Sequence, residues 1–270
     1  MTPGDEERMV LVDTHAHLED SRLRGDLPGV LARARAAGVV QVVAIGTTAA
    51  DSATVVAIAR SHRGIFAAVG IHPNEAAEAR PGDWTRVEAL AARPGVVALG
   101  ETGLDRHRDR TPFPLQQEWF DRHLALGHAR GLPVVIHCRD CEHDIIEHLT
   151  HLGRPVRGVL HSFTGGRDEA QAFLGLGLHL SFAGMVTFAN KALDALRDVA
   201  ARVPLDRLLV ETDSPYLSPH PHRGRINEPQ RVAVTAERLA RLRGLSPAEL
   251  ARITTANARH LFALPSDETL

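Results

Sequence analysis

The sequence predicts a single α/β domain, spanning residues 1–270, that folds as a (β/α)8 TIM barrel with extra C-terminal helices. Eight short apolar runs recur along the chain, and segments with apolar residues at helical spacing separate them. The runs are apolar at nearly every position, which is typical of parallel strands buried on both faces. A length of 270 residues is ordinary for one barrel of this kind.

The predicted strands follow one another at intervals that leave room for a helix after most of them. They occupy residues 9–15, 39–46, 66–72, 95–101, 133–138, 157–162, 178–184 and 208–213. The intervening segments 26–38, 51–64 and 114–131 each end at a glycine, which commonly stops a helix. An open doubly wound sheet is the alternative, but no glycine-rich nucleotide-binding motif follows the first strand.

Residues 228–262 predict two further helices. Within the "GLSPAE" segment that separates them, Ser246 can cap the second helix and Pro247 can be its first residue. We therefore expect the chain to continue in helices after the last strand.

Composition excludes several classes of protein. The apolar fraction is 44% and the charged fraction 24%, which fits a large core rather than disorder. A net charge of -2 leaves no global basic field to attract nucleic acid, so any phosphate binding must be local. The acidic N-terminal segment "MTPGDEERM" lacks the apolar stretch of a signal peptide. No segment is apolar enough to span a membrane, and we expect a cytoplasmic protein.

Polar side chains end six of the eight predicted strands. The six strand ends carry, in chain order, His15 and His17, then His72, Glu101, His137, His161 and Asp213. Because a barrel gathers the C-terminal ends of its strands at one mouth, we expect these side chains to converge there. Imidazoles and carboxylates in such a set are typical ligands of divalent metals.

The spacing of these residues predicts two metals that share a carboxylate. His15 and His17 are two residues apart in a strand, so both project from the same face. We assign them to one ion with Asp213, and we assign a second ion to His137 and His161. Glu101, from a strand between the two sets, is best placed to bridge. Two such ions can activate a water and clamp the attacking and leaving oxygens of a hydrolysis.

Further residues are expected to act on the substrate or on the ligands. Besides bridging, Glu101 is assigned a catalytic role, as are Asp213, which can accept the proton of the attacking water, and His72, which can contact a phosphate or protonate a leaving oxygen. Residues near the mouth predicted to bind substrate are Arg139, Arg223, Arg225 and Asn227. Arginine suits bidentate phosphate contacts. Asp105 and His222 are expected to orient the metal ligands from behind.

Eight motifs in a fixed order resemble a known family. They are "DTHAHL", "GIHP", "GETGLD", "VIHCRD", "HSF", "ETDSPYL", "RGRINEP" and "TTANARHLF", and they run through residues 12–262. Together they resemble the TatD family of metal-dependent deoxyribonucleases in the amidohydrolase superfamily. The resemblance implies a (β/α)8 barrel whose metal positions map onto the six ligands above. It also implies that the protein removes nucleotides from DNA 3′ ends or cuts DNA with Mg²⁺ or Mn²⁺, in DNA repair or turnover. Its partner would be DNA, either single-stranded or at 3′ ends.

One motif departs from the family pattern. The segment that commonly reads H-S-R-D-A is "HCRDC" here, so Cys138 and Cys141 form a C-x-x-C pair. No thioredoxin-like order of elements surrounds the pair, and we interpret both as small buried residues rather than a redox couple.

Two other functions remain open from the sequence. The same site could hydrolyse carbonyl esters or amides, as an aminoacyl-tRNA deacylase does, or it could bind metal without catalysis. Superfamily members that open cyclic amides bridge their metals through a carbamylated lysine on strand 4. Lys191, the only lysine, follows the seventh predicted strand and cannot take that place. Mixed histidine and carboxylate ligands also accept Zn²⁺ or Ni²⁺. We expect a monomer.

Overall fold

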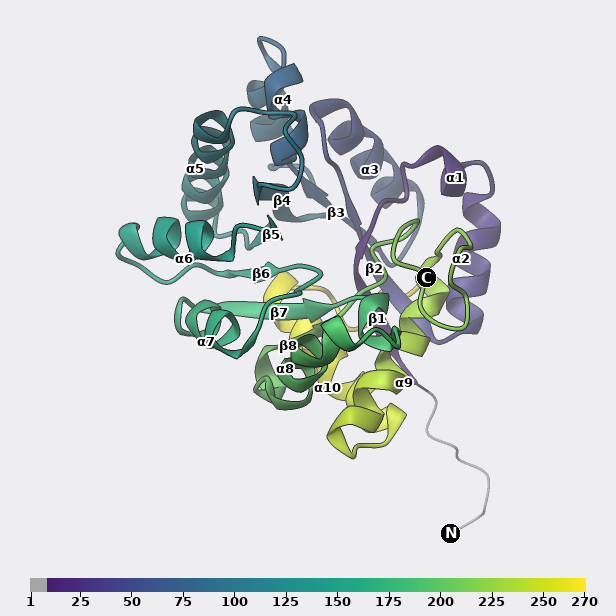
Figure 1. Cartoon of the computed structure of the whole chain (residues 1–270). Helices are drawn as coiled ribbons and strands as arrows, with labels where there is room; N and C mark the ends of the chain where they lie inside the picture. Colours follow the sequence, from purple (N-terminus) through teal and green to yellow (C-terminus); the bar gives the residue numbers. More distant parts are fainter. Residues whose placement is uncertain (1–8) are drawn as a thin grey trace, which may run out of the picture.

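The computed structural model describes residues 9–270 and contains an eight-stranded parallel barrel (Figure 1). The strands are β1 (Leu11–Ala16), β2 (Val39–Ile45), β3 (Ile65–Val69), β4 (Val96–Asp105), β5 (Val134–Arg139), β6 (Gly158–Leu160), β7 (Leu178–Phe182) and β8 (Leu208–Val210). Each strand pairs with the next in chain order. A parallel bridge between Ala16 and Ser214 joins the first and last strands beyond the end of β8. The predicted (β/α)8 barrel is confirmed, whereas the acidic segment 1–8 lies outside the described residues.

Helices surround the barrel on its outside (Figure 1). They are α1 (Ser21–Arg24), α2 (Leu27–Ala36), α3 (Ala49–Ser61), α4 (Asp83–Leu90), α5 (Phe113–Arg130), α6 (Glu142–His151), α7 (Arg167–Gly175), α8 (Asp194–Arg202), α9 (Val232–Arg243) and α10 (Pro247–Phe262). Short 3-10 turns are η1 (Pro73–Glu78), η2 (Gly184–Thr187), η3 (Lys191–Leu193), η4 (Leu205–Arg207) and η5 (Pro229–Arg231). The two predicted C-terminal helices are α9 and α10, and the Ser246 side chain caps α10 by accepting a hydrogen bond from the Glu249 amide.

Two apolar cores hold the barrel together. The larger lies between the strands and the surrounding helices. The smaller combines alternate strand residues such as Val43, Val135 and Leu209 with Leu261 and Phe262 of α10. Val135 and Leu209 precede His137 and Asp213 by even numbers of residues, so they point to the barrel interior beneath the site. Within residues 9–270, no helix combines the length and hydropathy that a bilayer crossing needs.

The fourth strand differs from the sequence prediction. It does not end at Glu101 but continues to Asp105, pairing with β5 as far as Arg139. The pairing register shifts between Leu99 and Thr102, so the strand bulges where Glu101 lies. A bulge can re-aim a side chain, which explains how a mid-strand carboxylate reaches the barrel mouth.

A buried histidine predicts a pH dependence of stability. His123 of α5 is fully buried; its Nδ1–H donates to the Trp119 carbonyl (2.6 Å), and its Nε2 accepts from the Ile71 amide (3.0 Å). Burial lowers the pKa of His123 to about 4. The unfolded chain therefore takes up a proton below about pH 6.5 that the folded protein refuses. His123 should cost the fold about 2 kcal/mol of unfolding free energy between pH 7 and pH 5.

Urea titrations of wild type and His123→Gln across this pH range test the expectation. Glutamine can still accept the Ile71 amide bond but does not titrate, so the variant should lose less stability on acidification. His151→Gln, at an exposed position of α6, serves as the control and should follow the wild type. Parallel pH curves for wild type and His123→Gln would contradict the assignment.

Candidate metal centre

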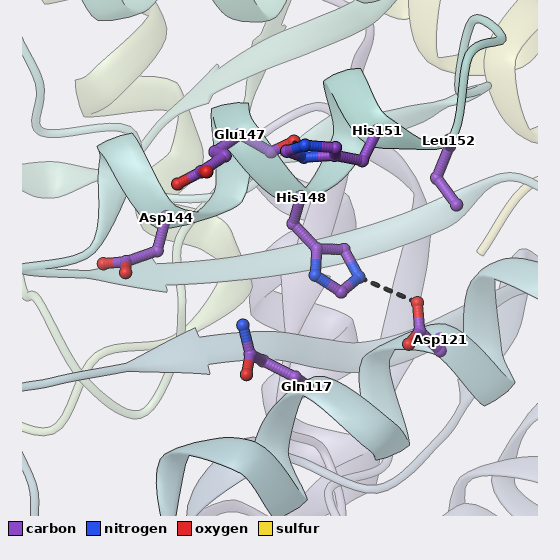
Figure 2. Close-up of a pocket in the computed structure, with 7 residues that line it drawn as sticks. All are labelled: Gln117, Asp121, Asp144, Glu147, His148, His151 and Leu152. Atoms are coloured by element: carbon purple, nitrogen blue, oxygen red, sulfur yellow. Dashed lines mark hydrogen bonds and ion pairs between the residues drawn. The ribbon is translucent and has the colours of Figure 1, made fainter.

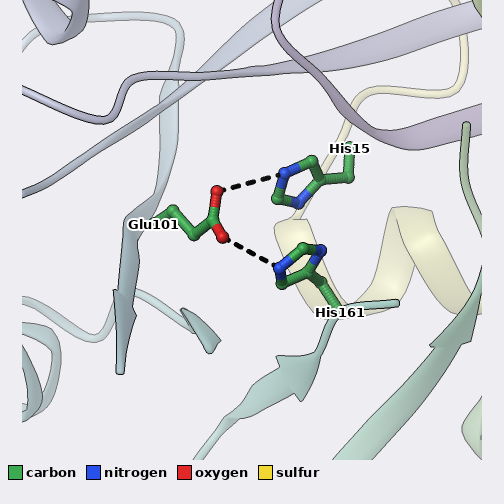
Figure 3. Close-up of side chains that lie close together, drawn as sticks. All are labelled: His15, Glu101 and His161. Carbon is green, nitrogen blue, oxygen red and sulfur yellow. Dashed lines mark ion pairs between the residues drawn. The ribbon is translucent and has the colours of Figure 1, made fainter. Parts of the chain in front are cut away.

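The six predicted metal ligands converge at the C-terminal mouth of the barrel. They come from β1, β4 and β5 and from the segments that directly follow β1, β6 and β8. Figure 3 shows the Glu101 carboxylate facing the neighbouring rings of His15 and His161, with a different carboxylate oxygen toward each imidazole. His15, Glu101 and His161 are buried, so little water competes for their ligand atoms.

The first group of ligand atoms comes from β1 and the segment after β8. His15 Nε2 lies 3.3 Å from His17 Nε2 and 3.7 Å from Asp213 Oδ1, and His17 Nε2 lies 3.5 Å from the same oxygen. These separations are longer than good hydrogen bonds. Atoms bound at about 2.1 Å to one ion lie about 3.0–3.4 Å apart, so the observed spacing suits a shared metal. The three side chains could therefore hold a cation.

The second group surrounds the other oxygen of Glu101. His137 Nδ1 lies 2.8 Å and His161 Nε2 2.9 Å from Glu101 Oε1, and the two nitrogens are 3.4 Å apart. His72 Nε2 approaches the same oxygen at 3.4 Å. Glu101 Oε2 instead faces His15 at 3.4 Å and His17 at 3.7 Å. Each carboxylate oxygen thus belongs to a different set of imidazoles.

Carboxylates orient two of the histidines from behind. The Nε2 of His137 lies 3.0 Å from Asp105 Oδ2, which leaves Nδ1 toward Glu101. The Nδ1 of His161 lies 3.3 Å from Glu211 Oε1, which leaves Nε2 toward Glu101. Such partners fix the tautomer and ring orientation of a metal-binding histidine. Asp105 therefore stands where the sequence prediction expected an orienting residue.

The sequence interpretation missed two buried carboxyl groups. Glu211 also accepts the Ser162 amide (2.8 Å), and Asp13 accepts the Thr212 amide (2.9 Å) and hydroxyl (2.6 Å), tying β1 to the segment after β8. Each stands two residues before a predicted ligand, so the two-residue alternation of a strand could have pointed to both. Burial raises the pKa of Asp13 to about 8.

Charge in the cluster is balanced between carboxylates and imidazoles. Burial alone would raise the pKa of Glu101, but the imidazoles of His161 and His72 and the contacts from His137 hold it well below its ordinary value. Burial alone would lower the pKa of His161, but Glu101 and Glu211 raise it well above the usual range. Protons on imidazoles can thus balance the negative charge of the carboxylates. A divalent cation could take over that positive charge.

The neutral state of His72 follows from its surroundings. It caps η1, where its Nδ1 accepts the Asn74 amide at 3.0 Å, so the ring proton lies on Nε2. Burial lowers the pKa of His72 to about 4. At neutral pH this side chain can donate a hydrogen bond into the site.

The structure separates the predicted substrate contacts into two kinds. Arg139, Arg223 and Arg225 are exposed at or beyond the ends of β5 and β8. Asn227 is fully buried, and its amide donates to the carbonyls of Thr212 (2.9 Å) and Tyr216 (2.7 Å). Asn227 therefore supports the segment after β8 and has no surface for substrate, contrary to the sequence prediction.

His222 is not brought into the cluster. Within residues 9–270, no hydrogen bond or ion pair joins its imidazole to a metal-ligand candidate. His220 and His222 lie in a turn rather than a strand, with the His222 amide donating to the Pro219 carbonyl at 2.6 Å, so the H-x-H spacing does not place both rings on one strand face.

The C-x-x-C pair lies behind the site. Cys138 and Cys141 are both free, with their sulfurs 3.8 Å apart, and the Cys141 thiol donates to the Leu104 carbonyl. Both side chains pack against the larger apolar core. Cys141 fits the interpretation as a small buried residue, whereas Cys138 is only half-buried.

A second group of titratable side chains lines a groove on the outer surface between α5 and α6 (Figure 2). His148 of α6 points across it to Asp121 of α5, with 2.8 Å between Nε2 and Oδ1. Among residues 9–270, the sets of side chains close enough to share an ion lie at the barrel mouth and not in this groove.

Known proteins share this architecture and sequence. The family model described as TatD related DNase matches residues 12–263. The chain belongs to the TatD family. The uncharacterized metal-dependent hydrolase YabD of Bacillus subtilis is 39% identical over 256 residues, covering 94% of this chain and all of YabD. The 3′-5′ ssDNA/RNA exonuclease TatD of Edwardsiella piscicida is 36% identical over 260 residues, covering 94% of this chain and 100% of that protein.

A solved TatD homologue has the same fold. The crystal structure of YJJV from Escherichia coli K12 matches with a TM-score of 0.87 and 32% identity, covering 94% of this chain and 98% of that one. The resemblance inferred from the eight motifs is thereby confirmed. This TatD-family protein is a metal-dependent hydrolase, and its His, Glu and Asp cluster could bind the metal.

Proposed function

We propose that this protein is a two-metal nuclease that removes nucleotides from the 3′ end of single-stranded DNA, and of RNA as well. We infer two metals because the two carboxylate oxygens of Glu101 face different pairs of imidazoles. Its Oε2 faces His15 and His17, while its Oε1 faces His137 and His161. A carboxylate shared in this way is the expected bridge between two neighbouring ions.

Each ion would have its own set of ligands. His15, His17 and Asp213 would hold one with Glu101 Oε2, and His137 and His161 would hold the other with Glu101 Oε1. When bound, two divalent ions supply Lewis-acid stabilisation of the attacking and leaving oxygens. The mixed imidazole and carboxylate donors favour Mn²⁺ for activity, with Mg²⁺ a weaker substitute.

The chain's own side chains would handle protons and substrate oxygens. The carboxylate of Asp213 can accept the proton of an attacking water. Burial alone would raise its pKa, but His17 and His15 hold the pKa of Asp213 below its ordinary value, so it is ionised at neutral pH. The neutral His72 donates its Nε2 proton as a hydrogen bond to a phosphate oxygen.

Positively charged side chains around the barrel mouth would attract the nucleic-acid strand. The net charge of the chain is -2, so attraction of a polyanion must come from particular side chains. Arg139, Arg223 and Arg225 are exposed at the mouth end of the barrel, and we assign them phosphate contacts. The names of the relatives from Edwardsiella piscicida and Enterobacter lignolyticus, both 3′-5′ ssDNA/RNA exonucleases, support this substrate over a carbonyl ester or amide.

A cleavage assay with metal-stripped protein tests the proposal. The substrate is a 5′-labelled single-stranded oligonucleotide, and a second copy carries a blocked 3′ end. Adding Mn²⁺ should restore stepwise shortening of the oligonucleotide with a free 3′ end, and the blocked copy should stay intact. The rate at low substrate concentration should fall steeply with salt, because phosphate contacts release counterions. Protein that binds two ions yet cleaves no strand would contradict the nuclease, and aminoacyl esters would be tested next.

A further inference from the structure

An exposed aromatic ring stands beside the metal centre. Tyr216, the only tyrosine in the chain, is 48% exposed. The large apolar side chains exposed within residues 9–270 are Val10, Leu205, Tyr216 and Ile226. Tyr216 is thus the one aromatic member of that set, and an exposed aromatic ring beside a candidate nuclease site offers a surface on which an unpaired base can stack.

The ring is held close to the ligands of the first ion. Tyr216 follows Asp213 by three residues, and its amide donates to the Asp213 carbonyl at 2.8 Å. The buried Asn227 donates to the Tyr216 carbonyl at 2.7 Å. The ring centroid lies 5.9 Å from that of His17, edge to face at 75°. The tyrosine ring therefore contacts His17, a proposed ligand of the first ion, and two hydrogen bonds anchor the backbone of Tyr216.

The Arg22 guanidinium lies against one side of the Tyr216 ring. Its guanidinium carbon lies 4.6 Å from the Tyr216 ring centroid, and Asp20 fixes the guanidinium through contacts of 2.9 Å at Nε and 2.7 Å at Nη2. With Arg22 and His17 against it, Tyr216 still remains 48% exposed. A flat, partly exposed ring that already contacts a cation resembles the stacking sites that bind unpaired bases.

We propose that Tyr216 is a stacking platform for an unpaired nucleobase of the strand whose end is hydrolysed. This inference rests on the proposed nuclease function and names how its substrate is recognised. A base on Tyr216 would place its nucleotide beside His17 and Asp213, with its sugar-phosphate chain entering the cluster. Stacking is tolerant of base identity because every base has a π face, so the ring would select unpaired strands without selecting a sequence.

The test compares oligonucleotides that differ only in the bases near the 3′ end. One strand is complete, and the other carries abasic tetrahydrofuran residues at its last positions, with the same phosphodiesters. Values of kcat/KM for wild type, Tyr216→Phe, Tyr216→Ala and Ile226→Ala are measured with Mn²⁺. Ile226, 49% exposed in the same loop, is the matched control for loss of an exposed apolar side chain.

We expect wild type, Tyr216→Phe and Ile226→Ala to prefer the complete strand by about 5- to 150-fold. The preference should fall to about one in Tyr216→Ala. An unchanged preference in Tyr216→Ala, or an equal loss on both strands, would overturn the stacking role. Equal cleavage of the two strands by wild type would overturn this inference alone. Cleavage of neither would overturn the proposed function, and this inference with it.

The matching RNA strands separate base recognition from sugar recognition. A ring that stacks on the base should give the same ratio of complete to abasic cleavage for DNA and for RNA. An effect of Tyr216→Ala confined to one of the two sugars would place the contact on the sugar and overturn the proposal.

Discussion

Replacing Glu101 with glutamine is expected to reduce the rate of hydrolysis by more than ~100-fold. Mutating a residue that only hydrogen-bonds to a metal ligand costs up to about that factor, and Glu101 is proposed to be a ligand itself. The amide keeps the shape of the side chain but loses the charge and one of the two oxygens. Both oxygens are in use, since Oε2 faces His15 and Oε1 faces His137 and His161. The variant should therefore also bind Mn²⁺ more weakly, and calorimetric titration beside strand-cleavage rates would measure both effects.

Glu147→Gln is the matched control for this experiment. Glu147 is exposed on α6, in the outer groove, and the substitution makes the same chemical change away from the barrel mouth. Its rate and Mn²⁺ affinity should equal those of the wild type. A Glu101→Gln variant that cleaves within threefold of wild type would contradict the bridging role.

Replacing Gly103 with alanine is expected to destabilise the barrel by about 3 kcal/mol or more, through backbone strain together with overpacking. Gly103 has φ of 139°, in a region that side chains rarely allow. A Cβ there would lie 2.1 Å from the backbone oxygen of His137. That oxygen belongs to the neighbouring strand and cannot swing away, so β4 and β5 must separate. Urea unfolding measures the loss, and Mn²⁺ affinity should fall because His137 moves with its strand.

Gly131→Ala separates the two causes. Gly131 caps α5 with φ of 66°, and a Cβ there would meet no atom within 4 Å. It should cost only about 1 kcal/mol, the price of the left-handed backbone alone. Equal losses from the two alanine variants would show that close approach of β4 and β5 is not what requires a glycine at position 103.

Much of the fold could be predicted from the sequence because a buried parallel strand is a short run of apolar residues. Each of the eight apolar runs overlaps a strand, and the polar residues at their ends include all six side chains that now lie together. This works because the ends of barrel strands share one mouth whatever the loops do. The cap at Ser246 was readable for a similar reason, since it depends on neighbours in the chain.

The features that the sequence did not predict depend on contacts between distant segments of the chain. The bulge that turns Glu101 inward arises from the register of β4 against β5, which no run of residues in β4 reveals. Asn227 was mistaken for a substrate contact because its burial depends on how the loop after β8 folds back on Thr212. Asp13 and Glu211 were overlooked although they precede ligands by two residues, because buried carboxyls are unexpected without the partners the fold supplies.

Anomalous diffraction from crystals grown with Mn²⁺ would show whether two ions share Glu101. We expect two peaks at the barrel mouth, about 3.5–4 Å apart. Glu101 should lie between them, with His15, His17 and Asp213 on one side and His137 and His161 on the other. A single peak, or a second one held by side chains outside this cluster, would contradict the shared carboxylate and the two-metal mechanism built on it.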